Sequence, residues 1–86
     1  MGVFTQVQLR RQELISKGFP VNKLVMVTNA VTILAILQET VHDKELIKNY
    51  KQTRTFYGMD VVIIKGDNFD HNRHIHFEIF EQLNKN

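Results

Sequence analysis

The 86-residue chain contains no cysteine and no tryptophan, only one proline, and four glycines that stand far apart. Without cysteine, disulfides and thiolate metal sites are excluded. The isolated glycines do not form a phosphate-binding or dinucleotide-binding loop, and no nucleophile motif is present. The longest apolar stretch, Leu24 to Leu37, is too short for a membrane helix, which needs about 20 residues. We therefore expect a cytoplasmic protein with no enzymatic activity, no cofactor and no membrane contact.

The length of the chain fits one domain, residues 1–86, with no room for a second core. A chain of this size buries only roughly 60–65% of the surface that its unfolded form exposes, so its stability depends on dense apolar packing or on a partner. Its charge is uneven: residues 1–55 carry a net charge of +4 and residues 56–86 a net charge of −2. Such asymmetry suits an acidic partner or contact between copies of the chain.

The apolar pattern predicts an α+β fold, with two to three N-terminal helices followed by a β-hairpin. The first helix is expected at about residues 4–17, because Val3, Val7 and Leu14 form an apolar face that ends before Gly18 and Pro20. The other helices are expected at about 22–40 and 43–52, and Asn22 and Asp43 are their candidate N-caps. The hairpin is expected to pair strands at about 56–65 and 74–81, with a turn at residues 66–68.

The segment 22–40 allows two interpretations. Val25 and Val27 are β-branched, so residues 23–28 can form a buried strand that ends at Thr28 and Asn29. We prefer one helix, because the small or polar side chains fall on one narrow helical stripe. Such a helix is apolar over most of its circumference and must be covered on more than one side. A second copy of the chain is the expected cover, with an oligomer interface formed by Leu24, Val27, Val31, Leu34 and Leu37.

Three of the four histidines lie within six residues, at and just before the start of the last predicted strand. Strict alternation from residue 74 to 80 predicts that His74, His76 and Glu78 share one face of this strand. Two imidazoles and a carboxylate can hold zinc or another transition metal, and Asp70 or His71 could complete the set of ligands. A solvated polar sheet face explains the same pattern.

The segment His74-Ile75-His76-Phe77-Glu78 also resembles the terminal H-x-H-F-E strand of the LytM-type zinc peptidases. In that family one of these histidines binds zinc and the other assists the chemistry. The resemblance covers about seven residues, and the upstream H-x-x-x-D ligand pair of the family is missing. We therefore expect no peptidase activity.

A basic stripe marks the third predicted helix. Lys44, Lys48 and Lys51 repeat at helical spacing, and Arg54 follows. Three helices followed by a hairpin resemble the order of elements in winged-helix proteins, which implies DNA binding through residues 43–52. However, the second predicted helix is too long for that fold and the turn of the hairpin is acidic. An ordinary lysine-coated surface helix explains the stripe equally well.

Together these observations predict a small binding or regulatory protein, such as an inhibitor, a regulator or an assembly component. It resembles the compact accessory proteins of phages and plasmids. It is expected to act through protein–protein contacts with an unidentified protein partner and as a homo-oligomer. A nucleic-acid-binding regulator is the first alternative, and a histidine-based metal-binding protein is the second.

Overall fold

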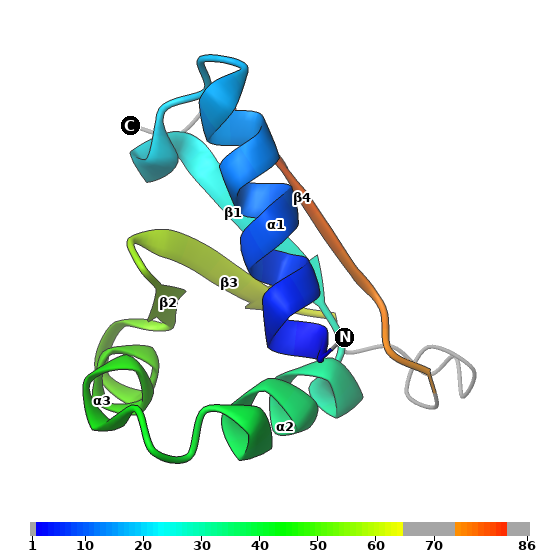
Figure 1. Cartoon of the computed structure of the whole chain (residues 1–86), viewed down its shortest axis with the longest axis vertical. Helices are drawn as coiled ribbons and strands as arrows, with labels where there is room; N and C mark the ends of the chain where they lie inside the picture. Colours follow the sequence, from blue (N-terminus) through cyan, green and yellow to red (C-terminus); the bar gives the residue numbers. More distant parts are fainter. Residues whose placement is uncertain (1, 65–73, 83–86) are drawn as a thin grey trace.

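The computed structural model describes residues 2–64 and 74–82. In this part of the chain it contains three α-helices, one short 3-10 helix and four β-strands (Figure 1). Their order is α1 (Val3–Ser16), η1 (Val21–Lys23), β1 (Leu24–Thr28), α2 (Ala30–Glu39), α3 (Lys44–Thr53), β2 (Thr55–Phe56), β3 (Met59–Ile63) and β4 (Phe77–Glu81). The prediction of an α+β fold with three helices is therefore confirmed.

The four strands form one mixed sheet in the order β2-β3-β1-β4. Strand β1 is central: it pairs in parallel with β3, with Val27 beside Val62, and antiparallel with β4, with Val27 beside Glu78. The two-residue strand β2 pairs antiparallel with β3. The edges of the sheet are therefore a very short strand on one side and the five-residue strand β4 on the other.

The predicted C-terminal hairpin is only partly correct. Strands do form inside both predicted ranges, at 59–63 and 77–81, but β1 lies between them and they do not pair with each other. The hairpin that forms is β2–β3, which turns at Tyr57 and Gly58, and both have positive φ, 49° and 83°. Two positive φ values in a two-residue loop make a type I′ turn. The predicted turn at residues 66–68 lies outside the described residues.

The prediction of one helix over residues 22–40 is wrong for residues 22–29. Residues 24–28 form β1, and the helix begins only at Ala30. The N-cap is Asn29 rather than Asn22, because the Asn29 side chain accepts the backbone N–H of Thr32 at 3.0 Å. Strand β1 is apolar on both faces, which suits a central strand with a neighbouring strand along each edge. The alternative of a strand over 23–28 was the correct one.

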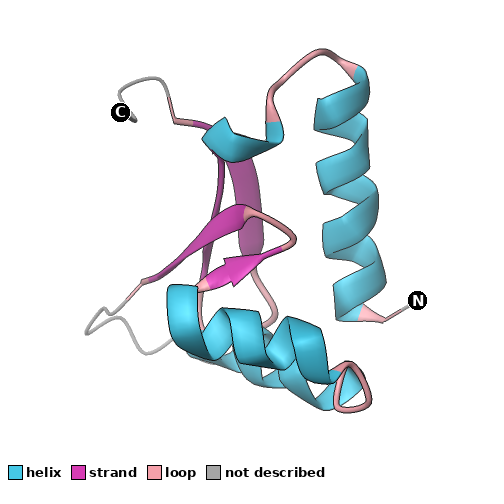
Figure 2. Cartoon of the chain, turned by 90° about the vertical axis from the view of Figure 1, so that its left-hand side faces the viewer, coloured by secondary structure: helices cyan, strands magenta, loops and turns pink. Residues whose placement is uncertain are grey.

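Helix α1 covers one face of the sheet, while α2 and α3 lie at one end of it (Figure 2). The buried apolar side chains of all these layers form one core cluster, which consists of Val7, Leu14, Leu24, Met26, Ile33, Ile36, Leu46, Tyr50, Phe56, Met59, Val61 and Ile79. Successive side chains of each strand point alternately into this core and toward the opposite face of the sheet. No helix of the described residues covers that opposite face (Figure 2). We call this opposite surface the open face.

Both ends of α1 are fixed by specific contacts. At its start, the Glu39 carboxylate at the end of α2 accepts the backbone N–H groups of Val3 and Phe4, both at 3.1 Å. A Cβ atom on Gly2 would collide with this carboxylate, so only glycine fits there without rearrangement. At its end, Gly18 adopts φ +98° and the N–H of Phe19 reaches back to the carbonyl of Leu14. This is a Schellman cap, and it confirms the predicted stop at Gly18.

Candidate interaction surfaces

Residues 74–76, which contain two of the histidines, are attached to the rest of the protein by hydrogen bonds of their backbone, and both histidine side chains are exposed. The His76 carbonyl accepts the Thr28 hydroxyl at 2.7 Å, and the His76 N–H donates to the Thr32 hydroxyl at 2.8 Å. Asn29 donates its side-chain amide to the His74 carbonyl at 2.7 Å. Strand β4 begins only at Phe77, so the two histidines precede the strand instead of alternating along it.

The three proposed metal ligands His74, His76 and Glu78 are all exposed side chains. Among residues 2–64 and 74–82, no group of three histidine, aspartate or glutamate side chains comes close enough to hold a metal ion. Asp70 and His71 lie outside the described residues. In the described chain, this segment serves to attach the last strand to the end of β1.

Thr28, Asn29 and Thr32 form a buried polar network at that attachment. All three side chains are at most 2% exposed. The Thr32 hydroxyl lies 2.6 Å from the side-chain oxygen Oδ1 of Asn29 and 3.0 Å from the backbone carbonyl oxygen of His76, but it has only one hydrogen to donate. The Thr28 hydroxyl satisfies the His76 carbonyl in either case. Because buried polar groups need partners, this network fixes residues 74–76 against the start of α2.

The basic stripe on α3 is present as predicted. Lys44, Lys48 and Lys51 are exposed and border a shallow hollow of about 390 Å³, together with Ile47 and Gln52. Arg54 follows the helix in the left-handed conformation, and it does not extend the stripe freely. Its guanidinium lies over the Tyr50 ring, 5.3 Å from the centroid, and donates to the Tyr50 hydroxyl at 3.0 Å.

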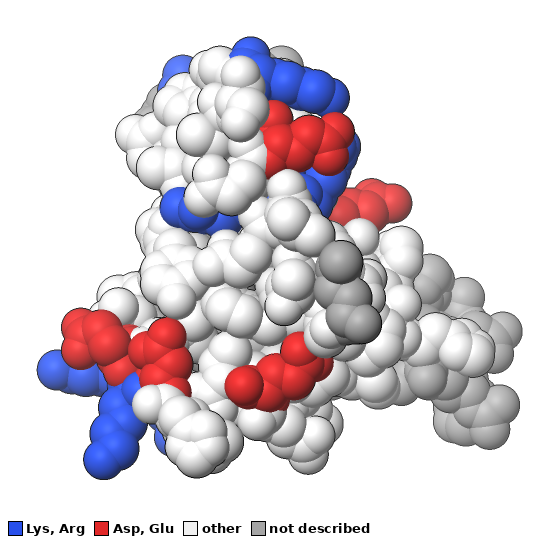
Figure 3. Space-filling view, viewed as in Figure 1, with Lys and Arg blue, Asp and Glu red and all other residues white. Residues whose placement is uncertain are grey.

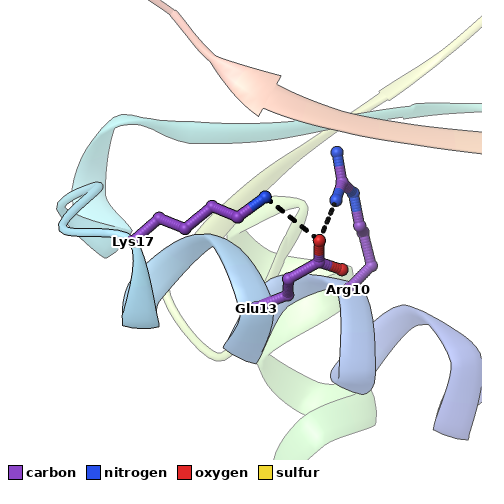
Figure 4. Close-up of polar contacts among 3 residues, drawn as sticks. All are labelled: Arg10, Glu13 and Lys17. Atoms are coloured by element: carbon purple, nitrogen blue, oxygen red, sulfur yellow. Dashed lines mark hydrogen bonds and ion pairs between the residues drawn. The ribbon is translucent and has the colours of Figure 1, made fainter.

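The charged side chains on the α1 side of the molecule fall into separate groups. Figure 3 shows basic and acidic side chains together over the end of α1 and again near α3, and most of the surface between these groups is uncharged. On α1, Glu13 accepts Arg10 at 2.9 Å and Lys17 at 3.2 Å (Figure 4). The hydrogen bond from Arg10, followed by that from Lys17, lowers the pKa of the Glu13 carboxyl below its ordinary value.

Tyr57 is an exposed residue with a strained backbone, at the tip of the β2–β3 turn. Its left-handed backbone is unusual for an aromatic residue, and contacts on several sides hold it. The Arg11 guanidinium donates to the Tyr57 carbonyl at 3.1 Å, and the Tyr57 hydroxyl donates to Asp43 at 3.3 Å. Partial burial, and then the neighbouring Asp43 carboxylate, raise the pKa of the Tyr57 hydroxyl above its ordinary value of 10.0. These contacts link α1, the turn and the start of α3.

The five residues predicted for an oligomer interface do not share one surface. Leu24 lies in the core with no exposure, and Val27 lies on the open face. Val31 and Leu37 are half-buried on α2, while Leu34 on the same helix is 60% exposed. The surface that we expected on one continuous helix is therefore divided between the core, α2 and the sheet.

The open face carries apolar side chains that the sequence analysis did not single out. Val62 is 49% exposed and Phe80 is 46% exposed, and Ile64 continues the same side of β3. Val27 lies beside Val62, and Val25 lies beside Phe80. The sequence did contain a signal for this face. In 59–63 and 77–81, apolar residues occupy positions on both sides of the strand, so some of them must lie outside the core. The carboxylates on this face are Asp60 and Glu78, which flank the apolar strip.

A groove runs between α1 and the edge strand β4. It has a volume of about 690 Å³ and is lined by Gln6, Leu9, Arg10 and Glu13 from α1 and by Phe77, Glu78, Ile79 and Phe80 from β4. Leu9 is 54% exposed although it lies beside this groove. An apolar side chain next to an unpaired strand edge is a feature of surfaces that accept another strand.

Comparison with family models, with curated proteins and with solved structures finds no match for this chain. Among the described residues, no helix combines the length and the apolar character that crossing a membrane requires. The surfaces described above are therefore the basis for any functional assignment.

Proposed function

We propose that the protein is a small binding or regulatory protein of the cytoplasm that performs no chemistry itself and acts through protein–protein contacts, with a second copy of the chain as its first partner. The observation that carries this proposal is the open face, where Val62, Phe80 and Ile64 remain exposed on an otherwise well-packed sheet. Exposed apolar groups gathered on one face mark interaction sites more often than scattered ones do.

The energetic weight of this face can be judged from Phe80. Phenylalanine has roughly 200 Å² of surface to bury, and 46% of Phe80 is exposed, so about 90 Å² remain available. At about 25 cal/mol per Å², covering this area contributes about 2 kcal/mol. A few such side chains are enough to offset part of the entropy that two chains lose when they associate.

The experiment compares the mass of the protein in solution over a dilution series for the wild type and two variants. Wild type should associate at micromolar concentration. Phe80→Asp should remain monomeric, because it places a carboxylate on the open face. Leu34→Asp is the matched control, since it puts a charge at another exposed apolar position, on α2, away from the sheet. If Leu34→Asp dissociates the protein and Phe80→Asp does not, the interface lies on α2 and the open face has no part in it.

Nucleic-acid binding by α3 is the second candidate, and the exposure of its three lysines along one hollow supports it. Binding of this kind must weaken as salt rises, because counterions are released from the phosphates. Changing Lys44, Lys48 and Lys51 together to glutamate should abolish it while the far-ultraviolet circular dichroism stays unchanged. Absence of binding to duplex and single-stranded probes at low salt would remove this candidate.

A further inference from the structure

Strand β4 presents an open edge, whereas the opposite edge of the sheet is protected. The opposite edge is β2, which has only two residues and ends in a tight turn. Strand β4 has five residues, Phe77-Glu78-Ile79-Phe80-Glu81, with β1 paired on one side and no strand of the described residues paired on the other. Proteins usually block such edges with charged side chains, above all lysine, or with proline, a bulge or a very short strand. The sequence of β4 contains neither lysine nor proline, and its charged residues are Glu78 and Glu81.

The backbone groups on this edge can be assigned from two hydrogen bonds. The Gln82 N–H donates to the Lys23 carbonyl at 2.8 Å, so residue 82 points toward β1. On the other side of β1, the Ile64 N–H donates to the Thr28 carbonyl at 2.7 Å, so Thr28 points toward β3 and not toward β4. Because donors and acceptors alternate along an antiparallel strand, the even-numbered residues 78, 80 and 82 point toward β1. The backbone groups of Phe77, Ile79 and Glu81 therefore point toward the open edge.

We infer that two copies of the chain pair antiparallel along β4, about a two-fold axis at Ile79, and form one continuous eight-stranded sheet. This inference rests on the self-association proposed above and specifies its geometry. In this register Ile79 faces Ile79 of the second copy, and Phe77 faces Glu81. These are the residues whose N–H and carbonyl groups point outward, so the pairing makes six new backbone hydrogen bonds.

The side chains of β4 are complementary to themselves in the same register. Glu78 lies opposite Phe80, and Glu81 lies opposite Phe77, so no carboxylate faces another carboxylate directly. On the helix side, Phe77 and Ile79 of the second copy extend toward the groove beside α1, where Leu9 is exposed. On the other side, the pairing joins the two open faces into one surface. A two-fold arrangement of this kind closes on itself and stops at the dimer.

Hydrogen exchange of the wild-type protein tests this geometry without any substitution. The amides of Ile79 and Glu81 should exchange rapidly in dilute, monomeric protein and become protected as the concentration rises. The Phe80 amide is the internal control, because it bonds to β1 and should be protected at all concentrations. Rapid exchange of Ile79 and Glu81 at a concentration where the protein is dimeric would overturn the inference.

One proline variant and one charge variant distinguish pairing along the strand edge from stacking of the open faces. Glu81→Pro removes an N–H that only the second copy can use, so the dissociation constant should rise by roughly tenfold or more while the monomer keeps its circular dichroism. Val62→Asp lies two strands away from the edge and should leave the dimer intact. If Val62→Asp dissociates the protein and Glu81→Pro does not, the copies stack through their open faces, and the inference fails while the proposed function stands. A wild type that is monomeric throughout contradicts both.

Discussion

Replacing Asn29 with alanine should cost about 2 to 4 kcal/mol of unfolding free energy, although only one small polar side chain is shortened. Asn29 is 2% exposed and is the N-cap of α2, where it accepts the Thr32 N–H. Loss of such a cap typically costs about 1 kcal/mol. The same side chain donates to the His74 carbonyl at 2.7 Å, and leaving a buried partner unsatisfied costs a further 1 to 3 kcal/mol, approximately.

The matched control is Asp43→Ala at the N-cap of α3. Asp43 also accepts one backbone N–H, from Leu46 at 3.0 Å, but it is only half-buried, and its other partner is the exposed Tyr57 hydroxyl at 3.3 Å. Its loss should cost about 1 kcal/mol. Both values can be measured by urea denaturation with linear extrapolation to water. Equal costs for the two caps would refute the reasoning, because the network around Asn29 would then contribute nothing beyond an ordinary cap.

Asn29→Asp separates the two roles of this side chain, as acceptor for the Thr32 N–H and as donor to the His74 carbonyl. The carboxylate keeps an acceptor for the Thr32 N–H, but at pH 7 it cannot donate to the His74 carbonyl and it must be buried. We expect this variant to be at least as unstable as Asn29→Ala. The His76 amide, which donates to Thr32, should also exchange faster with solvent in both variants. Unchanged protection of that amide would show that residues 74–76 are held by other contacts.

Three further predictions follow from single contacts. In an absorbance titration, the midpoint for Tyr57 should lie above pH 10.0, and in Asp43→Asn it should move back toward pH 10.0. The raised pKa belongs to the folded state. The stability that the protonated Tyr57 hydroxyl contributes is therefore present below pH 10.0 and is lost as the pH rises through the folded pKa. Glu39→Ala should destabilise the protein by up to about 1 kcal/mol, and by less in high salt, because the carboxylate binds the start of α1. Thermal melts at two salt concentrations measure this difference. An equal loss of stability at both concentrations would mean that packing alone is responsible. Gly18→Ala should cost about 1 kcal/mol in urea denaturation because of its φ of +98°; a neutral substitution there would mean that the cap rearranges.

The sequence predicted most local elements correctly because their signals are local. The apolar face of α1, the stop at Gly18 and the N-cap at Asp43 each depend on residues within a few positions of one another. Strands were expected at about 56–65 and 74–81, and strands do form within both ranges, at 59–63 and 77–81, since alternation and β-branched residues mark a strand without any knowledge of its neighbours.

The order of the strands could not be predicted, because it depends on contacts between distant segments. Nothing in residues 24–28 alone shows that β1 inserts between β3 and β4, and the apolar run around it is equally compatible with a helix. The end of β1 is set by Asn29, whose partner His74 lies 45 positions later in the chain. Once β1 was assigned to a helix, Leu24 was placed on a surface and the apolar residues of the open face were overlooked.

Sedimentation equilibrium of the wild-type protein tests the central claim most directly, since it requires neither a ligand nor a variant. The account predicts a reversible equilibrium between the 10.1 kDa chain and a species of twice that mass at micromolar concentration. A single species of 10.1 kDa at every concentration up to the millimolar range would contradict self-association through the sheet and the edge pairing inferred from it.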